Sequence, residues 1–300
     1  MTAKYFRFQK RVWLLSHTPT ISMDDSLGAN IWLDHADGRI YRVMPRCNPE
    51  VNRSWLSNTS RLAFQEFDKN RLPAMGFRVI QEVISETKSV GGKVALVAGG
   101  ACTIEDLAAL RMLKDSLGDS AELFGGTFKK VGAPDGIAMS GDPMANRMGF
   151  KLMGVPDDNL ADLVKRAGEF KVLVTVNADL FGEDAAAASA LEKIPSRIAL
   201  SAFNDATAAK ATLAFGIRHW SEIQGSMVNS LNILQKLNAC PVCPDEKLRP
   251  AYEVLSELAG AKFGCASEAF RQAGAYAPAL SGLTYDSIKS TGNLLEGGNA

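Results

Sequence analysis

The chain has 300 residues, 46% of them hydrophobic, which is enough to bury one large core or two modest ones. Its 33 basic and 33 acidic residues cancel, and this balance excludes the basic surplus that a nucleic-acid binder gathers into patches. Five scattered cysteines and the absence of an apolar run of roughly 18 residues favour a cytoplasmic protein, without a disulfide framework or direct membrane insertion.

The first region, residues 1–73, is predicted to contain a β-hairpin. The β-rich runs 31–33 and 40–43 flank the dipeptide Asp37-Gly38, a strong signal for a tight turn between two strands. Two prolines then interrupt regular structure, and a polar, mostly helical stretch follows from Asn58.

Residues 74–216 alternate apolar strand runs with helical patterns. Strands are predicted at 93–98, 171–176 and 197–201. Helices are predicted from a Thr103–Asp106 cap to Gly118, and at 160–164 and 184–193. Apolar strands separated by helices of this length indicate a mostly parallel sheet that is covered on both faces. We therefore predict a doubly wound α/β fold for this region.

The third region, residues 217–300, is predicted to be an irregular C-terminal part that packs on the α/β body. It holds an irregular segment at 218–238, a Cys-Pro-Val-Cys-Pro turn, a helix at 250–259 and a tail rich in Gly, Ala and Pro.

The turn contains a CxxC motif, Cys240 and Cys243, which is typical of a redox dithiol or of half a zinc site. A zinc site needs further ligands, but the chain has no second CxxC and only three histidines. A redox dithiol normally opens a helix, whereas Pro244 follows directly here. We favour two incidental thiols, and their role stays open.

Each of the other candidate sites can also be explained by an ordinary structural role. Gly99-Gly100 lies at a strand-to-helix junction that suits a phosphate, yet it lacks a dinucleotide or P-loop motif, which favours a tight turn. Cys102 has no histidine nearby in sequence to activate it.

Gly125-Gly126 and the run 141–147 are predicted loops, with Asp142 and Arg147 solvated or structurally paired. His219-Trp220 suggests a tryptophan in the core beside a histidine whose hydrogen bonds are satisfied. We expect no catalytic residue.

Residues 13–61 carry the most specific pattern in the chain. Four positions follow the spacing x2, x3 and x27 around the predicted hairpin, as the ligands of an iron–sulfur cluster would: Ser22, Asp25, Ala29 and Ser57. The segments that accompany them are Thr18-Pro19, Asn30-Ile31, Pro45-Arg46, Asn48-Pro49-Glu50-Val51-Asn52 and Trp55-Leu56. This pattern resembles the start of the molybdopterin-oxidoreductase-like part of the large iron–sulfur subunit (of G type) of bacterial NADH:quinone oxidoreductase, respiratory complex I. Weaker likeness continues at 146–154, 170–180, 207–229 and 249–255.

The resemblance implies a degenerate [4Fe–4S]-type domain over 1–73, followed by a shortened molybdopterin-oxidoreductase-like α/β domain. In that family the four positions hold cysteines, and here none does. Alanine cannot ligate iron, and Cys47 alone cannot replace four thiolates. We therefore expect no cluster, no other metal and no bound cofactor. The family's N-terminal cluster domains would sit on another polypeptide or be dispensable.

The resemblance predicts a non-catalytic scaffold subunit in the peripheral arm of a complex-I-type NADH:quinone oxidoreductase. Its expected partners are iron–sulfur and flavin subunits, and it would reach the membrane only through the complex. One alternative is a scaffold in another modular NAD-linked complex, of formate dehydrogenase or hydrogenase type. Another is a stand-alone small-molecule-binding α/β protein that uses the cleft near Gly99-Gly100 or 177–179.

Overall fold

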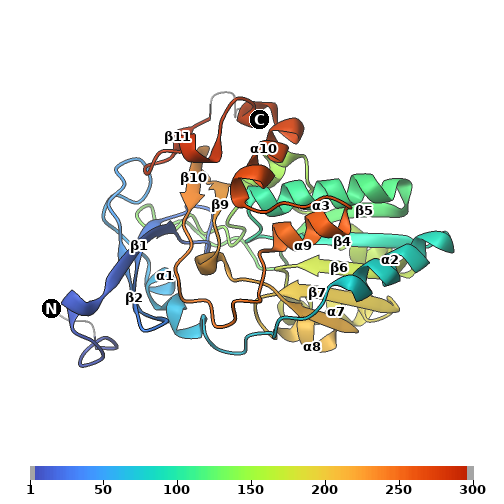
Figure 1. The fold of residues 1–300 in the computed structure, drawn as a ribbon, viewed down its shortest axis with the longest axis horizontal. Coiled ribbons are helices and arrows are strands. Elements are labelled where there is room, and N and C mark those ends of the chain that lie inside the picture. Colours follow the sequence, from blue (N-terminus) through green and yellow to red (C-terminus); the bar gives the residue numbers. More distant parts are fainter. Residues whose placement is uncertain (1–3, 296–300) are drawn as a thin grey trace.

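The computed structural model describes residues 4–295, which fold around three sheets (Figure 1). The first sheet is antiparallel, in the order β1 (Ser16–Ile21), β2 (Asn30–Ala36) and β3 (Arg39–Pro45). The predicted hairpin is confirmed, and its turn residues Asp37 and Gly38 have φ values of 52° and 70°, as a tight β-hairpin turn requires. β1 was not predicted, and it contains Pro19, a residue type that is rare in central strands. It is tolerated because β1 is an edge strand.

The central sheet has five parallel strands in the order β5-β4-β6-β7-β8, which confirms the α/β fold. They are β4 (Lys93–Gly99), β5 (Ala121–Gly126), β6 (Phe170–Val176), β7 (Ser196–Ser201) and β8 (Leu213–Gly216). The loop prediction for Gly125-Gly126 is wrong, because both residues end β5. A Cβ atom at Gly125 would lie 2.3 Å from the carbonyl oxygen of Pro156, so packing of a neighbouring backbone explains the glycine.

Helices cover both faces of this sheet, as predicted. One face packs against α2 (Arg78–Ser89), α3 (Ile104–Leu117), α4 (Arg147–Met153), α9 (Ala251–Leu258) and α10 (Ala266–Tyr276). The other packs against α5 (Leu160–Lys165), α6 (Leu180–Glu183) and α7 (Ala185–Leu191). Along β4, Val94 and Leu96 face the first set, whereas Ala95 and Val97 face the second. The Thr103–Asp106 capping box that begins α3 is confirmed.

Three helix assignments depart from the sequence prediction. α2 was not foreseen, α10 lies in the predicted irregular tail, and Arg147 begins α4 instead of ending a loop. The remaining short helices are α1 (Asn58–Leu62), α8 (Ala206–Lys210) and the 3-10 turns Val12–Leu14, Ala63–Glu66, Gly118–Ser120, Ala167–Glu169, Trp220–Glu222, Pro278–Leu280 and Tyr285–Ser287.

The third sheet overturns the prediction of an irregular segment at 218–238. It is antiparallel, in the order β11 (Asn293–Leu294), β10 (Ile233–Leu237) and β9 (Gly225–Val228). Every residue of β9 is buried, including Ser226, and so is Gln235 in β10. Because polar residues are buried here with hydrogen-bond partners, these strands lack the alternation that marks a half-buried strand.

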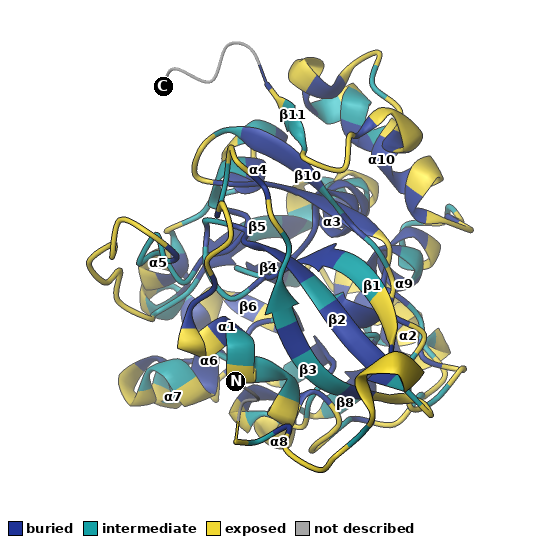
Figure 2. Ribbon diagram, turned by 90° about the vertical axis from the view of Figure 1, so that its left-hand side faces the viewer, coloured by how far each residue is buried: buried dark blue, intermediate teal, exposed yellow. Residues whose placement is uncertain are grey.

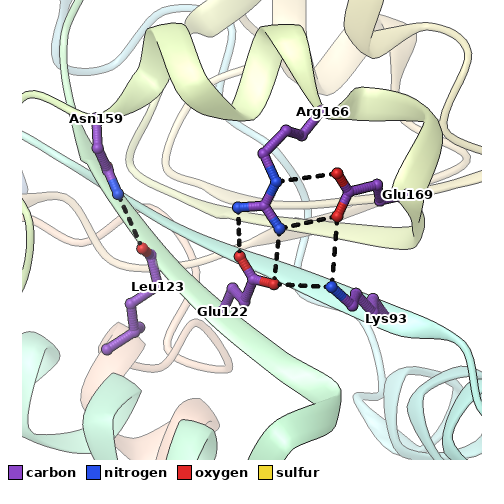
Figure 3. A network of polar contacts seen from close by, with 6 residues as sticks. All are labelled: Lys93, Glu122, Leu123, Asn159, Arg166 and Glu169. Atoms are coloured by element: carbon purple, nitrogen blue, oxygen red, sulfur yellow. Dashed lines mark hydrogen bonds and ion pairs between the residues drawn. The ribbon is translucent and has the colours of Figure 1, made fainter.

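The two ends of the central sheet differ in character. At the amino ends of the strands, Arg166 binds both Glu122 and Glu169, and Lys93 contacts the same two carboxylates in a surface network (Figure 3). The hydrogen bond from Arg166 lowers the pKa of Glu169 to about 2. The carboxyl ends of the strands instead face the first sheet, and the candidate site lies there (Figure 1).

Candidate functional site

The loop between β1 and β2, residues 22–29, contains three of the four ligand-like positions. The Ser22 N–H donates to the carbonyl of Ala29 at 2.9 Å and closes the base of the loop. Gly28 turns the chain with a φ of +62°, and a Cβ atom there would lie 2.7 Å from Nε2 of Gln235. The loop thus keeps a closed, tightly packed shape.

Each of the four positions makes a contact within the protein. The Ser22 hydroxyl donates to Asp24 at 2.6 Å. Asp25 accepts the N–H of Leu27 through Oδ1 and that of Ser140 through Oδ2, both at 2.9 Å. Burial raises the pKa of Asp25 although these hydrogen bonds oppose the shift.

The other two positions, Ala29 and Ser57, also make contacts within the protein. Ala29 is 4% exposed and packs in an apolar cluster with Leu33 and Leu56. Ser57 caps α1 by accepting the N–H of Ser60 at 3.0 Å. An iron–sulfur cluster of this type is normally held by four thiolates, and none of the four residues supplies one. The donor set does not fit that group.

Amide side chains from the C-terminal half hold the loop. Gln235 on β10 donates to the carbonyl of Gly28 at 3.0 Å and accepts from the Asn30 side chain at 2.6 Å. Asn229 donates to the carbonyl of Leu27 at 3.0 Å. These contacts join residues that are 202 to 207 positions apart in the sequence. The third sheet therefore secures the loop.

A second support comes from residues 140–147. The Ser26 N–H donates to the carbonyl of Asp142 at 2.9 Å. Asp142 in turn accepts from Arg147 at 3.0 Å, and Arg147 also reaches Asp157 at 2.9 Å. Burial alone would raise the pKa of Asp142, but the Arg147 guanidinium lowers it overall. The prediction that Asp142 and Arg147 are solvated or structurally paired is confirmed in its second form.

A pocket of about 310 Å³ lies where the loop meets the carboxyl ends of β4, β5 and β6. Its walls come from Met23, Asp24, Thr59, Gly99, Gly100, Ala101, Gly126, Thr127, Lys129, Pro143, Asn177, Ala178 and Glu183. β4 lies between β5 and β6, so the crossover direction reverses beside it, and open α/β sheets bind ligands at such points. The two regions named from the sequence, Gly99-Gly100 and 177–179, are thus brought together.

The charges in this pocket are already partly paired. Lys129 lies 3.7 Å from Glu183, whose carboxylate also accepts the hydroxyl of Thr127 at 2.7 Å. A Cβ atom at Gly99 would lie 1.9 Å from the carbonyl oxygen of Asn177. Close packing of two backbones therefore explains Gly99, which supports the tight-turn interpretation.

Burial disfavours the charged forms of three thiols and of the buried histidine. Burial raises the pKa of Cys102 well above its usual range and that of Cys240 to about 12, and it also raises that of Cys243. Burial lowers the pKa of His219 to about 3, so the ring stays neutral beside the Ser221 hydroxyl. Over residues 4–295, no group of three or more His, Cys, Asp or Glu side chains is placed to hold a metal ion.

Comparison with known proteins bears on the same elements. Residues 15–65 match the family model described as the NADH-ubiquinone oxidoreductase NDSU1/NuoG-like 4Fe-4S domain. This match spans β1 to α1 and so includes all four ligand-like positions. This part of the chain is therefore similar to the NuoG-like 4Fe-4S domain.

The relatives extend the similarity beyond that domain. The G subunit of NADH-quinone oxidoreductase from Rickettsia felis is 29% identical over 133 residues, and that from Rickettsia conorii is 30% identical over 133 residues. The mitochondrial 78 kDa subunit of NADH-ubiquinone oxidoreductase from Candida albicans is 29% identical over 133 residues. These matches cover 39–40% of this chain and 18–20% of each relative. The chain therefore spans about a fifth of the length of the curated relatives it matches.

Sequence reasoning found the four positions but missed their supports. Gln235 and Asn229 were placed in an irregular segment, and nothing local marks a glutamine on β10 as the partner of a loop near residue 28. The available signal was the Asn30-Ile31 pair, whose asparagine is wholly buried and bonds to Gln235.

Among the described helices, none is long and apolar enough to cross a bilayer.

Proposed function

We propose that this chain is a structural subunit of a complex-I-type NADH:quinone oxidoreductase that packs against the iron–sulfur electron-transfer subunit and carries no redox centre. One observation carries the proposal: a segment that matches a 4Fe-4S domain keeps its loop, hairpin and helix, while Ser22, Asp25, Ala29 and Ser57 make protein contacts instead.

Physical chemistry supports a stable domain without metal. A cluster contributes folding free energy through its ligands, so its loss leaves a loop that needs other contacts. Here hydrogen bonds from Ser140, Gln235 and Asn229 supply them. The loop is therefore fixed by the body of the same chain.

The architecture of the central sheet supports a structural role in the assembly. Its central sheet is covered on both faces by apolar packing, which suits a rigid body that stabilises a neighbour. We propose that the partners are iron–sulfur and flavin subunits, and that the chain lies in the peripheral arm on the cytoplasmic side.

Purification of the native assembly through a tag on this chain tests the proposal. We expect co-purifying subunits that contain flavin and iron–sulfur clusters and that oxidise NADH. Recovery of the chain without any flavin or iron–sulfur partner would contradict the proposal. Co-purification with a formate dehydrogenase or hydrogenase would place the same scaffold role in another complex.

The 310 Å³ pocket favours a second candidate function, the binding of a small polar molecule. It lies at the crossover reversal beside β4, where open α/β sheets bind ligands. A thermal-shift screen with nucleotides and pterins, repeated on Lys129→Ala, tests it. A rise in melting temperature that the variant loses would support this function, and an unchanged melting temperature with every compound would exclude it for these classes.

A further inference from the structure

The segment before β1, residues 4–14, presents apolar and basic side chains to solvent side by side. Phe8 is 92% exposed and Trp13 is 78% exposed, with Val12 and Leu14 also exposed. The same stretch contains Lys4, Arg7, Lys10 and Arg11 and no acidic residue. Because the whole chain is neutral, this is a local concentration of positive charge. Figure 2 shows the exposed start of β1 that continues from it.

This N-terminal segment is anchored at two points. Phe6 is buried, and the guanidinium of Arg42 lies 4.7 Å from the centre of its ring. The Lys10 ammonium pairs with Asp37 at 2.6 Å. A turn connects the two, with the Gln9 N–H donating to the carbonyl of Phe6 at 3.1 Å. The exposed side chains between and beyond these anchors are therefore held in a defined arrangement.

The backbone at Phe8 has a strained conformation of the kind found at binding sites. Its φ of 64° lies in the left-handed region, which bulky residues rarely adopt. Such outliers persist where the surroundings impose them and are concentrated at functional positions. Here the strain accompanies an almost fully exposed ring, over which the Arg7 guanidinium stacks at 4.8 Å.

A second pair repeats this arrangement. The Arg11 guanidinium lies 5.7 Å from the centre of the exposed Trp13 ring. Tryptophan and arginine are the residue types that contribute most binding energy at protein interfaces, and aromatic residues are enriched there. Residues 6–14 also enclose an open hollow of about 830 Å³ that no other residue of 4–295 lines. The segment thus offers two aromatic–arginine pairs around a space of its own.

We propose that the N-terminal segment docks onto a partner protein that presents an apolar protrusion surrounded by acidic side chains. Charge complementarity gives this chemistry, because Arg7 and Arg11 form no ion pair among residues 4–295 and need carboxylates once they are buried. Because the partner is taken to be another subunit of the same assembly, the inference rests on the proposed function.

The shape of the segment favours a protein over a lipid surface. Peripheral membrane segments present one apolar face of a continuous amphipathic helix. The N-terminal segment has only the three-residue 3-10 turn Val12–Leu14, and its aromatic side chains surround a hollow. A protruding group fits that shape better than a planar bilayer.

Photo-crosslinking in the native assembly tests the docking surface. The photoreactive residue p-benzoylphenylalanine replaces Trp13 in the full tagged chain, and the control replaces Val90, which is 75% exposed at the end of α2. α2 lies at the opposite end of the molecule from the N-terminus (Figure 1). We expect position 13 to label one other subunit, at a peptide that contains Asp or Glu beside apolar residues, and position 90 not to label it.

Charge reversal gives an independent measurement. We expect Arg7→Glu with Arg11→Glu to reduce the amount of chain retained in the purified assembly roughly tenfold, because like charges now face the acidic rim. The matched reversal Arg78→Glu with Arg271→Glu, at exposed positions on α2 and α10, should leave retention unchanged. Circular dichroism checks that both variants are folded.

The outcomes separate this inference from the proposed function. Unchanged retention with no crosslink from position 13, in an assembly that contains flavin, would overturn the docking surface alone. A crosslink to an acidic subunit in an assembly without flavin or iron–sulfur clusters would keep the surface and overturn the proposed function. A crosslink between two copies of the chain, or binding to phosphatidylserine vesicles that the reversal abolishes, would overturn the proposed partner.

Discussion

Asp25 illustrates the structural contacts made at a ligand-like position. Its two carboxylate oxygens accept one N–H from its own loop and one from Ser140, 115 residues away. The carboxylate thereby connects two loops. A structural contact is also seen at Ser57, whose hydroxyl caps α1.

Replacing Asp25 with alanine should lower the free energy of unfolding by about 1–3 kcal/mol, because two partly buried N–H groups lose their acceptor. Urea unfolding measures the change. Glu50→Ala, an exposed position without a side-chain hydrogen bond among the described residues, is the control and should change stability little. Equal effects of the two substitutions would show that the Asp25 contacts do not stabilise the loop.

Glu105 gives the protein a predictable dependence on pH. It is fully buried at the start of α3, where it accepts both the N–H and the hydroxyl of Ser226 at 2.7 Å. Burial raises its pKa from 4.5 to about 7. Between these two values the folded state holds a proton that the unfolded state releases, so stability falls as pH rises through this window.

We therefore expect the contribution of Glu105 to the free energy of unfolding to decrease between pH 5 and pH 8, by at most about 3 kcal/mol. Glu105→Gln removes this titration and keeps hydrogen-bonding groups for Ser226, so the variant should gain stability relative to the unsubstituted protein as pH rises over the same interval. Thermal unfolding at the two pH values measures the difference. Parallel pH profiles for the two proteins would contradict the assignment.

The strands and helices that the sequence predicts correctly are those whose own residues form a recognisable pattern. β4, β6 and β7 are apolar runs, and α3 carries its own capping box, so they could be located from their residues alone. β5 was missed because its glycines mimic a loop, although they are there to admit the backbone of 156–157.

The third sheet was hidden for another reason. β9 and β10 bury polar side chains whose partners lie far away in sequence, such as Glu105 for Ser226 and Gly28 for Gln235. Local periodicity contains no information about such long-range pairs. The four ligand-like positions could be found because their spacing is local, whereas their supports could not.

The β10 contact makes a test at this scale possible. Gln235→Ala should expose the backbone amides of residues 22–29 to faster hydrogen exchange, because the Gly28 carbonyl and the Asn30 amide lose a buried partner. Exchange followed by mass spectrometry measures it. Leu231→Ala, in the exposed turn of the same hairpin, is the control. If only the global exchange rate rises in Gln235→Ala, the contact does not act on the loop.

One buried ion pair connects all three regions of the molecule. Arg71, at the end of the first region, makes two hydrogen bonds to Glu222 of the third region and donates to the carbonyl of Ala202 after β7 at 3.0 Å. Both side chains of the pair are nearly inaccessible, at 8% and 3% exposure. The three regions thus share one polar contact in their common interior.

Arg71→Ala should destabilise the protein by about 3–5 kcal/mol, because Glu222 is left as a buried charge without its partner. Arg166→Ala, which breaks the surface network of Figure 3, should lower the melting temperature much less, since water replaces the lost contacts. Thermal unfolding compares the two. A larger loss for Arg166→Ala would mean that the regions are held together mainly elsewhere.

The iron content of the chain tests the central claim most directly, that a cluster-type domain folds here without a cluster. The chain is purified without oxygen, then treated with iron and sulfide under reconstitution conditions, and its iron and visible absorption are measured before and after. We predict a colourless, iron-free protein with the same melting temperature in both states. A brown protein with iron in stoichiometric amount would contradict this claim.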